Sequence, residues 1–182
     1  MLRAVAFSLS VLLAAPALAA DELVIPEEGF AVSEDIAQLP EPVRAKRDAL
    51  LAAAKSGDIA SLKLIFDAEL APPIVSFGDP PDAIAYLKEQ SADGEGREIL
   101  AILGELLDAP YAAMDGGDGG IIYIWPYFSA YEDMSQMTGS DEVEALRLVS
   151  YQEWQSLKEI GWLWWRVSMN ERGELQAFVA GD

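Results

Sequence analysis

The sequence predicts an α+β fold, in which N-terminal helices pack on a curved, mainly antiparallel sheet that is rich in aromatic residues. Apolar residues recur at helical spacing between residues 42 and 108, whereas residues 121–128 and 162–180 alternate as strands do. The chain has 182 residues, of which 52% are hydrophobic, and no cysteine. A domain of this length can form a core that stabilises it without disulfides. We therefore expect a single globular domain over residues 42–182.

Residues 1–20, MLRAVAFSLSVLLAAPALAA, have the pattern of a cleavable signal peptide. Arg3 precedes an apolar run, Pro16 breaks it, and the small residues that follow suit signal peptidase. A retained membrane anchor is the weaker alternative, because the run is shorter than the ~20 residues that span a bilayer. We expect cleavage after Ala19 or Ala20 and a periplasmic protein that is not inserted in the membrane after cleavage.

The charge of the chain excludes several classes of function. It holds 12 basic and 31 acidic residues, and loss of residues 1–20 removes one arginine, which leaves a net charge of 11 − 31 = −20. Nucleic-acid binding draws most of its affinity from basic groups, so DNA and RNA are excluded as partners. The chain also has no histidine, which removes Ser-His-Asp and Cys-His catalysis and the preferred ligands of zinc and copper. We expect neither a metal site nor a cofactor.

The N-terminal part of the chain predicts an extended arm and then two helices. Residues 21–41 mix acids, prolines and scattered hydrophobics without a period, which is typical of an arm. A helix is expected from Pro42, which suits a first helical position, to Lys55 before Gly57. Asp58 can cap a second helix, whose buried stripe is expected to consist of four residues: Leu62, Ile65, Phe66 and Leu70.

Two more helices are expected before the aromatic half of the chain. Residues 74–77 form a short strand candidate, and Asp79 is expected to cap a helix that starts at the prolines after it. The clearest amphipathic pattern follows Gly96, where four apolar residues fall at i, i+3, i+4 and i+7: Ile99, Ile102, Leu103 and Leu106.

The chain from Tyr111 onward carries twelve of the seventeen aromatic residues and all five tryptophans. Residues 121–128 are predicted as a strand that ends or reaches a sheet edge at Pro126. Residues 162–169 and 175–180 are separated by turn residues and predict an antiparallel hairpin.

Two short helices are expected between these strands, over residues 141–149 and 151–160. Ser150 and Glu153 form the pattern of a capping box at the start of the second helix. Trp154 is expected to face inward.

Residues 51–62, LAAAKSGDIASL, resemble the opening helix pair of NTF2-like (cystatin-like cone) domains, in which a helix, a Gly-Asp turn and a second helix precede a curved sheet. The segments YIWPYF at residues 123–128 and FVAGD at residues 178–182 resemble uncharacterised exported proteobacterial proteins. The NTF2-like resemblance implies a cavity closed by helices, in a fold used for binding, as a scaffold and occasionally for isomerase or dehydratase chemistry. Extra helices at 80–108 and 141–160 depart from that family, so another α+β layering is the alternative.

The candidate ligand-binding residues come from one face of each of two predicted strands: Tyr123, Trp125, Tyr127, Trp162, Trp164 and Arg166. Aromatic rings with a few polar groups are common in small-molecule sites. Arg166 within a sheet face needs a carboxylate or a stacked ring, and a ligand carboxylate could be its partner. The alternative is that the rings form core and that Arg166 pairs with an acid of the protein.

The loop between Asp115 and Gly120 places two acids among glycines and raises the question of calcium binding. Its spacing does not fit an EF-hand, which needs oxygen ligands at alternating positions and a glutamate at the twelfth. A glycine-rich hairpin turn or loop is favoured instead.

No catalytic residue is predicted, and the function expected is that of a soluble periplasmic binding or accessory domain with an aromatic-lined surface or pocket. Its partner would be a small molecule, a peptide or an envelope protein, and the oligomeric state stays open. One alternative is an isomerase or hydrolase-like enzyme that pairs a carboxylate with a tyrosine. The residues available for it are Asp79, Asp115, Glu132, Asp133, Tyr123, Tyr127 and Tyr131. Another is a structural partner of an envelope protein that docks through residues 21–41.

Overall fold

The computed structural model describes residues 23–117 and 120–181 of the chain. The predicted signal peptide with its cleavage site, and Asp118 of the glycine-rich loop, lie outside the described residues. Within the described ranges, no helix combines the length and the apolar character that a membrane span requires.

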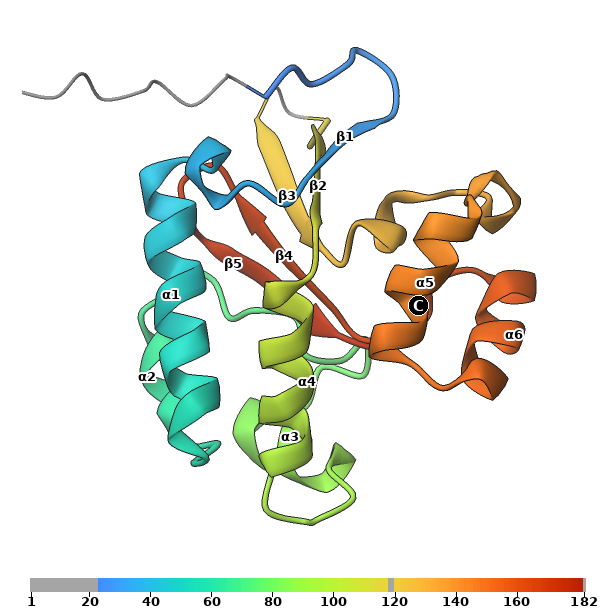
Figure 1. Ribbon diagram of the computed structural model, residues 1–182. Helices are drawn as coiled ribbons and strands as arrows, with labels where there is room; N and C mark the ends of the chain where they lie inside the picture. The colour runs from blue at the N-terminus through green and yellow to red at the C-terminus, as the bar shows by residue number, and fades with distance from the viewer. Residues whose placement is uncertain (1–22, 118–119, 182) are drawn as a thin grey trace, which may run out of the picture.

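The centre of the molecule is a five-stranded antiparallel sheet, in which the strand order follows the chain (Figure 1). Its strands are β1 (Phe30–Ser33), β2 (Tyr111–Asp115), β3 (Ile121–Trp125), β4 (Arg166–Asn170) and β5 (Leu175–Val179). Together with six α-helices, this sheet confirms the predicted α+β class. An NTF2-like relationship is neither confirmed nor contradicted by this architecture.

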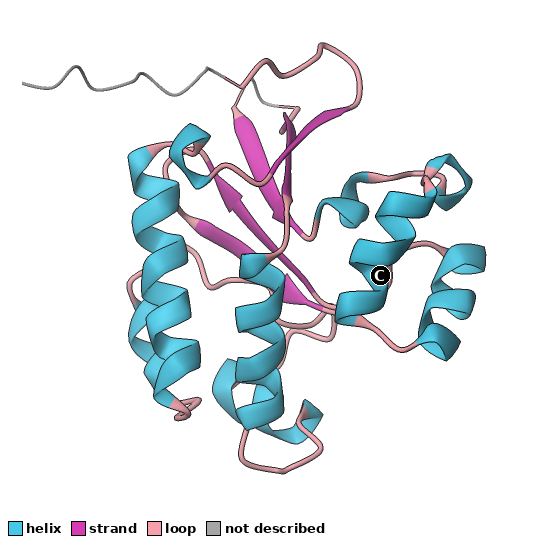
Figure 2. Cartoon of the chain, in the orientation of Figure 1, coloured by secondary structure: helices cyan, strands magenta, loops and turns pink. Residues whose placement is uncertain are grey.

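Four helices precede most of the sheet in the chain: α1 (Glu41–Ser56), α2 (Ser61–Asp67), α3 (Ala83–Gln90) and α4 (Arg97–Asp108). Figure 2 shows α1 and α4 side by side against the sheet. The predicted helix around Pro42 and the amphipathic helix after Gly96 are confirmed. The prediction for Leu70 is wrong, because α2 ends at Asp67 and Leu70 is 92% exposed.

The segment between α2 and α3 differs from the sequence prediction. Asp82, and not Asp79, caps α3, since its side chain accepts hydrogen bonds from Ile84 N and Ala85 N at 3.0 Å. Asp79 lies in the left-handed region of backbone space, with φ of 46°. The expected strand 74–77 is reduced to a single parallel bridge between Ile74 and β5.

The two remaining helices, α5 (Gly139–Leu148) and α6 (Tyr151–Ile160), confirm the predicted pair. The Ser150 and Glu153 capping box is present, and Trp154 is fully buried as predicted. Figure 1 shows both helices on the opposite side of the sheet from α1 and α2.

Several strand predictions need correction. The strand predicted from residue 121 ends at Trp125, which confirms the end expected at Pro126, because proline cannot continue the ladder. Tyr127 and Phe128, which the alternation predicts as strand residues, instead begin a 3₁₀ helix (Tyr127–Ala130). Within the segment expected to be an arm, Phe30–Ser33 forms the edge strand β1 and pairs with β2. Strand β2 was not predicted, since the small residues between Tyr111 and Asp115 do not alternate in hydrophobicity.

The sheet carries a hydrophobic core on each face. Tyr111 and Ala113 belong to the core beneath α1 and α4, whereas Ala112 between them belongs to the core beneath α5 and α6. The first core, called the helix core below, also contains Val43, Leu50, Leu103, Tyr123, Trp125, Val167, Met169 and Phe178. The second, called the C-terminal core, contains Tyr127, Phe128, Met134, Ala145, Val149, Trp154, Leu157 and Trp162.

Candidate functional site: two pockets beside residues 69–74

The aromatic residues predicted to bind a ligand lie mainly in the two cores. Tyr123 and Trp125 belong to the helix core, while Tyr127 and Trp162 belong to the C-terminal core, and all four are buried. Trp164 is partly buried and packs against both cores. Neither of the two pockets described below is lined by any of these rings.

The rings fill the space around one another. The ring centres of Tyr111 and Trp125 lie 5.4 Å apart, and those of Phe128 and Trp162 lie 5.0 Å apart. Trp162 also meets Trp164 edge to face and donates a hydrogen bond from Nε1 to the Trp165 carbonyl at 3.2 Å. This geometry is that of packed aromatic core. Ligand binding by the aromatic residues therefore stays a prediction.

Arg166 finds its partners within the protein. Its Nη1 donates to the Gly181 carbonyl at 2.8 Å, and its guanidinium carbon lies 5.9 Å from the centre of the Phe77 ring. The stacked ring expected for an arginine in a sheet face is thus supplied by Phe77. Phe77 comes from the segment between α2 and α3, so Arg166 fastens that segment to the end of the sheet.

A tyrosine and a carboxylate do pair, although neither lines the two pockets described below. The Tyr127 hydroxyl donates to Asp141, whose other carboxylate oxygen accepts from Thr138 N and Oγ1 in the capping box of α5. Burial and the Asp141 charge raise the pKa of Tyr127 well above its usual range. Burial alone would raise the pKa of Asp141, but the hydrogen bonds from Tyr127 and Thr138 lower it. A tyrosine held neutral beside a carboxylate held ionised suits a structural link better than proton transfer.

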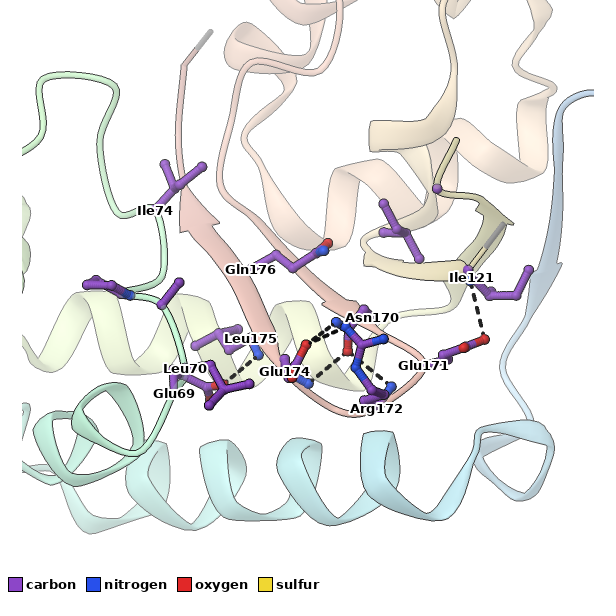
Figure 3. Close-up of a pocket in the computed structure, with 15 residues that line it drawn as sticks. Glu69, Leu70, Ile74, Ile121, Asn170, Glu171, Arg172, Glu174, Leu175 and Gln176 are labelled. Atoms are coloured by element: carbon purple, nitrogen blue, oxygen red, sulfur yellow. Dashed lines mark hydrogen bonds and ion pairs between the residues drawn. The ribbon is translucent and has the colours of Figure 1, made fainter. Parts of the chain in front are cut away.

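The hairpin pocket is a cavity of about 410 Å³ formed where two hairpins meet the 69–74 segment. Figure 3 shows Glu69, Leu70 and Ile74 on one side, Ile121 of β3 on the other, and the turn between β4 and β5 between them. Its apolar walls are aliphatic: Leu70, Ala71, Pro72, Ile74, Ile121, Ile122 and Leu175. Its polar lining residues are Glu69, Asn170, Glu171, Arg172, Glu174 and Gln176.

The turn between β4 and β5 is fixed by its contact with the start of α1. Gly173 has φ of 73°, and a Cβ atom there would lie 2.3 Å from the Pro42 carbonyl oxygen. Glycine is required both by the left-handed backbone and by the close approach of α1. The polar rim of the hairpin pocket is therefore held in one place.

A β-bulge directs one polar side chain to the pocket. The register between β4 and β5 shifts so that Ser168 faces Ala177 while Met169 faces Leu175, which leaves Gln176 as the extra residue. The Gln176 carbonyl accepts from Ile74 N at 2.9 Å, and its exposed side chain lines the pocket. Bulges often re-aim a side chain in this way.

The carboxylates of the hairpin pocket differ in whether a basic residue neutralises their charge. Glu69 is buried and pairs with Lys46, and it also accepts from Leu175 N at 3.2 Å. Glu174 pairs with Arg172 at 3.0 Å, and hydrogen bonds from Arg172 and Asn170 lower the pKa of Glu174. Glu171 accepts only from Ile121 N at 3.4 Å, and no basic group among residues 23–117 and 120–181 is within ion-pair distance of it.

The proline pocket is a second, open cavity of about 770 Å³ that adjoins the same segment. Glu69, Pro72 and Ile74 line both pockets. Four prolines and five hydrophobic residues supply its apolar lining: Pro72, Pro73, Pro80, Pro81, Phe66, Ile74, Val75, Ala83 and Ile84. Its acids are Asp67, which pairs with Lys63 at 2.8 Å, Glu69, Asp79 and Asp82.

Sequence reasoning missed both pockets. The sequence indicates turns at Asn170–Gly173 and around Gly116, but these turns meet the 69–74 segment through long-range contacts of Glu69 and Ile74 that no local pattern shows. The pair Pro72-Pro73 was a usable signal, because it forces an extended segment that ends α2. In the part of the chain that the structure describes, no group of three acids is arranged to hold a metal ion.

Comparison of the chain with protein-family models, with curated protein sequences and with solved structures finds no match in any of the three.

Proposed function

We propose that this protein is a non-catalytic binding domain of the bacterial periplasm, and that the hairpin pocket holds a small organic cation with an aliphatic body. The observation that supports this proposal best is a 410 Å³ pocket with aliphatic walls and one unbalanced carboxylate, Glu171. Small-molecule sites commonly have about 300–1,000 Å³ and combine apolar walls with few polar groups. The periplasmic address rests on the signal-peptide pattern of residues 1–20.

The charge of the pocket favours a cation over an anion. Arg172 is the only basic residue that lines the described pocket, and Glu174 already balances it. A ligand carboxylate would have to compete with Glu174 and would lie near Glu69 and Glu171. A ligand ammonium group would instead balance Glu171, while the net charge of −19 attracts cations over a longer range.

The test compares three probes that share one six-carbon chain: hexylammonium, hexanoate and hexanol. We expect hexylammonium to shift the backbone amide NMR signals of Ile121, Ile122 and Gln176, and to bind more tightly than the other two. Shifts that cluster instead around Trp164 and Arg166, or equal binding of all three probes, would contradict the proposal.

A variant that narrows the pocket tests its location. Ala71 is exposed and lines the hairpin pocket, so Ala71→Trp is expected to weaken hexylammonium binding by at least roughly tenfold, which corresponds to about 1.4 kcal/mol. Ala85→Trp, at an exposed position of α3 outside the pocket lining, is the matched control and should leave binding unchanged.

A further inference from the structure

The two pockets form one surface with a shared ridge. The ridge consists of Pro72, Pro73 and Ile74, of which Pro72 and Ile74, together with Glu69, line both pockets. Ile74 is held rigidly, because its N–H donates to the Gln176 carbonyl and its carbonyl accepts from Phe178 N, both at 2.9 Å. A ligand longer than the hairpin pocket would therefore extend over a fixed apolar ridge into the proline pocket.

The ridge offers no free hydrogen-bond donor. Pro72 and Pro73 lack a backbone N–H, and the N–H of Ile74 is already used by Gln176. A peptide crossing the ridge would bring carbonyl groups that find no donor there, whereas a methylene chain needs none. The side chain of Ile74, about half exposed, offers such a chain an apolar contact.

Unbalanced acids lie on both sides of the ridge. Glu171 is the one in the hairpin pocket. In the proline pocket, Lys63 pairs with Asp67 and also attracts Asp82 over a longer distance, while neither Asp79 nor Asp82 has a basic partner within ion-pair distance among the described residues. Asp82 caps α3 with one carboxylate oxygen, Oδ1, which accepts from Ile84 N and Ala85 N.

We propose that the two pockets together bind a linear aliphatic polyamine, with one ammonium group beside Glu171, a second beside Asp79 and Asp82, and the methylene chain across Pro72 and Ile74. This inference rests on the proposed function, because it places the first ammonium group in the hairpin pocket. It adds that the ligand is a chain with at least two separated charges.

The first test is a series of linear aliphatic amines with one, two, three and four amino groups, measured by isothermal titration calorimetry at low salt. Each additional exposed charge pair strengthens binding only modestly, so we expect the three- and four-amine chains to bind roughly tenfold more tightly than hexylammonium. This gain should shrink as salt is added, because salt screens exposed charges. Hexylammonium binding without any gain along the series would overturn the polyamine inference and leave the proposed function standing. No binding of hexylammonium would overturn the proposed function.

Substitutions of the acidic residues test where the second ammonium group binds. The double variant Asp79→Asn and Asp82→Asn removes both charges conservatively, because asparagine tolerates a positive φ and also caps helices. We expect it to bring the affinity for the four-amine chain to within about twofold of that for hexylammonium, while hexylammonium binding itself stays unchanged. Glu171→Gln should weaken both ligands, and Glu105→Gln, at an exposed position of α4 outside both pockets, should weaken neither. Unchanged polyamine affinity in the double variant would refute the second contact.

Discussion

The helix core and the C-terminal core differ from the two pockets in the kinds of residue that form them. The cores bring together rings from distant parts of the chain, with Trp125 and Trp154 fully buried, and no tryptophan lines either of the two pockets. The pockets are lined by prolines, aliphatic side chains and carboxylates at places where turns and the bulge at Gln176 interrupt regular packing. In this protein a concentration of rings marks the core, whereas irregular backbone marks the two pockets.

The largest expected effect concerns the packed helix core. Trp125→Ala should lower the free energy of unfolding by about 3–5 kcal/mol, because it opens a cavity beside the Tyr111 ring in the helix core. Leu70→Ala removes an apolar side chain from the hairpin pocket and should change the free energy by less than about 0.5 kcal/mol, since Leu70 is exposed. Urea denaturation measures both. Similar losses of unfolding free energy in the two variants would contradict the difference between the packed core and the open pocket.

An intermediate effect is expected where the pocket rim meets α1. Gly173→Ala should destabilise the protein by about 2–3 kcal/mol, because alanine disfavours the positive φ and its Cβ would overlap the Pro42 carbonyl. Gly139→Ala, at a glycine that has open space around it and no positive φ, is the control and should be close to neutral. Thermal unfolding followed by circular dichroism gives the comparison. A stable Gly173→Ala variant would mean that the turn is not fixed by α1.

The smallest of the three effects concerns the link between the C-terminal core and α5. Tyr127→Phe should cost about 1.5 kcal/mol at pH 7, because Asp141 loses a hydrogen bond to its charged carboxylate. The folded state lowers the pKa of Asp141, so the stabilisation from its ionised form is present above the unfolded pKa of about 3.9 and is lost as the pH falls through the folded pKa.

The pH dependence provides the check on this link. The difference in unfolding free energy between wild type and Tyr127→Phe should shrink between pH 5 and the acid limit of about pH 2. Tyr151→Phe, at an exposed position of α6, should match the wild type throughout. A difference that stays constant into acid would show that Asp141 does not act through its charge.

The sequence predicted the helices well because their signals are local. The apolar spacing after Gly96 and the capping box at Ser150 depend only on neighbouring residues, and both elements form as predicted. Strand β2 was missed because Ala112 and Ala113 are small and both are buried, one in each core, so the alternation that reveals a half-buried strand is absent. Strand β1 pairs with residues some eighty positions later, a contact that no local pattern carries.

The candidate site could be predicted only in part, for the same reason. The pattern around Trp162 and Arg166 indicated aromatic strands, but whether a ring faces a pocket or a core depends on which helix covers it. In the structure, α5 and α6 cover Trp162, which packs in the C-terminal core. The pockets arise from tertiary contacts of Glu69, Ile74 and Gln176, three residues that have no distinctive sequence pattern.

The bridge made by Ile74 has a consequence for how copies of this chain meet one another. An open edge strand invites a neighbouring molecule to extend the sheet and begin an aggregate. At β5, Ile74 occupies the Gln176 carbonyl and the Phe178 N–H that such a neighbour would use. At the other edge, β1 is only four residues long and is followed at once by Glu34 and Asp35. Ile74 thus protects the β5 edge of the sheet from fibrous association. The short length of β1 and the acidic residues that follow it protect the other edge.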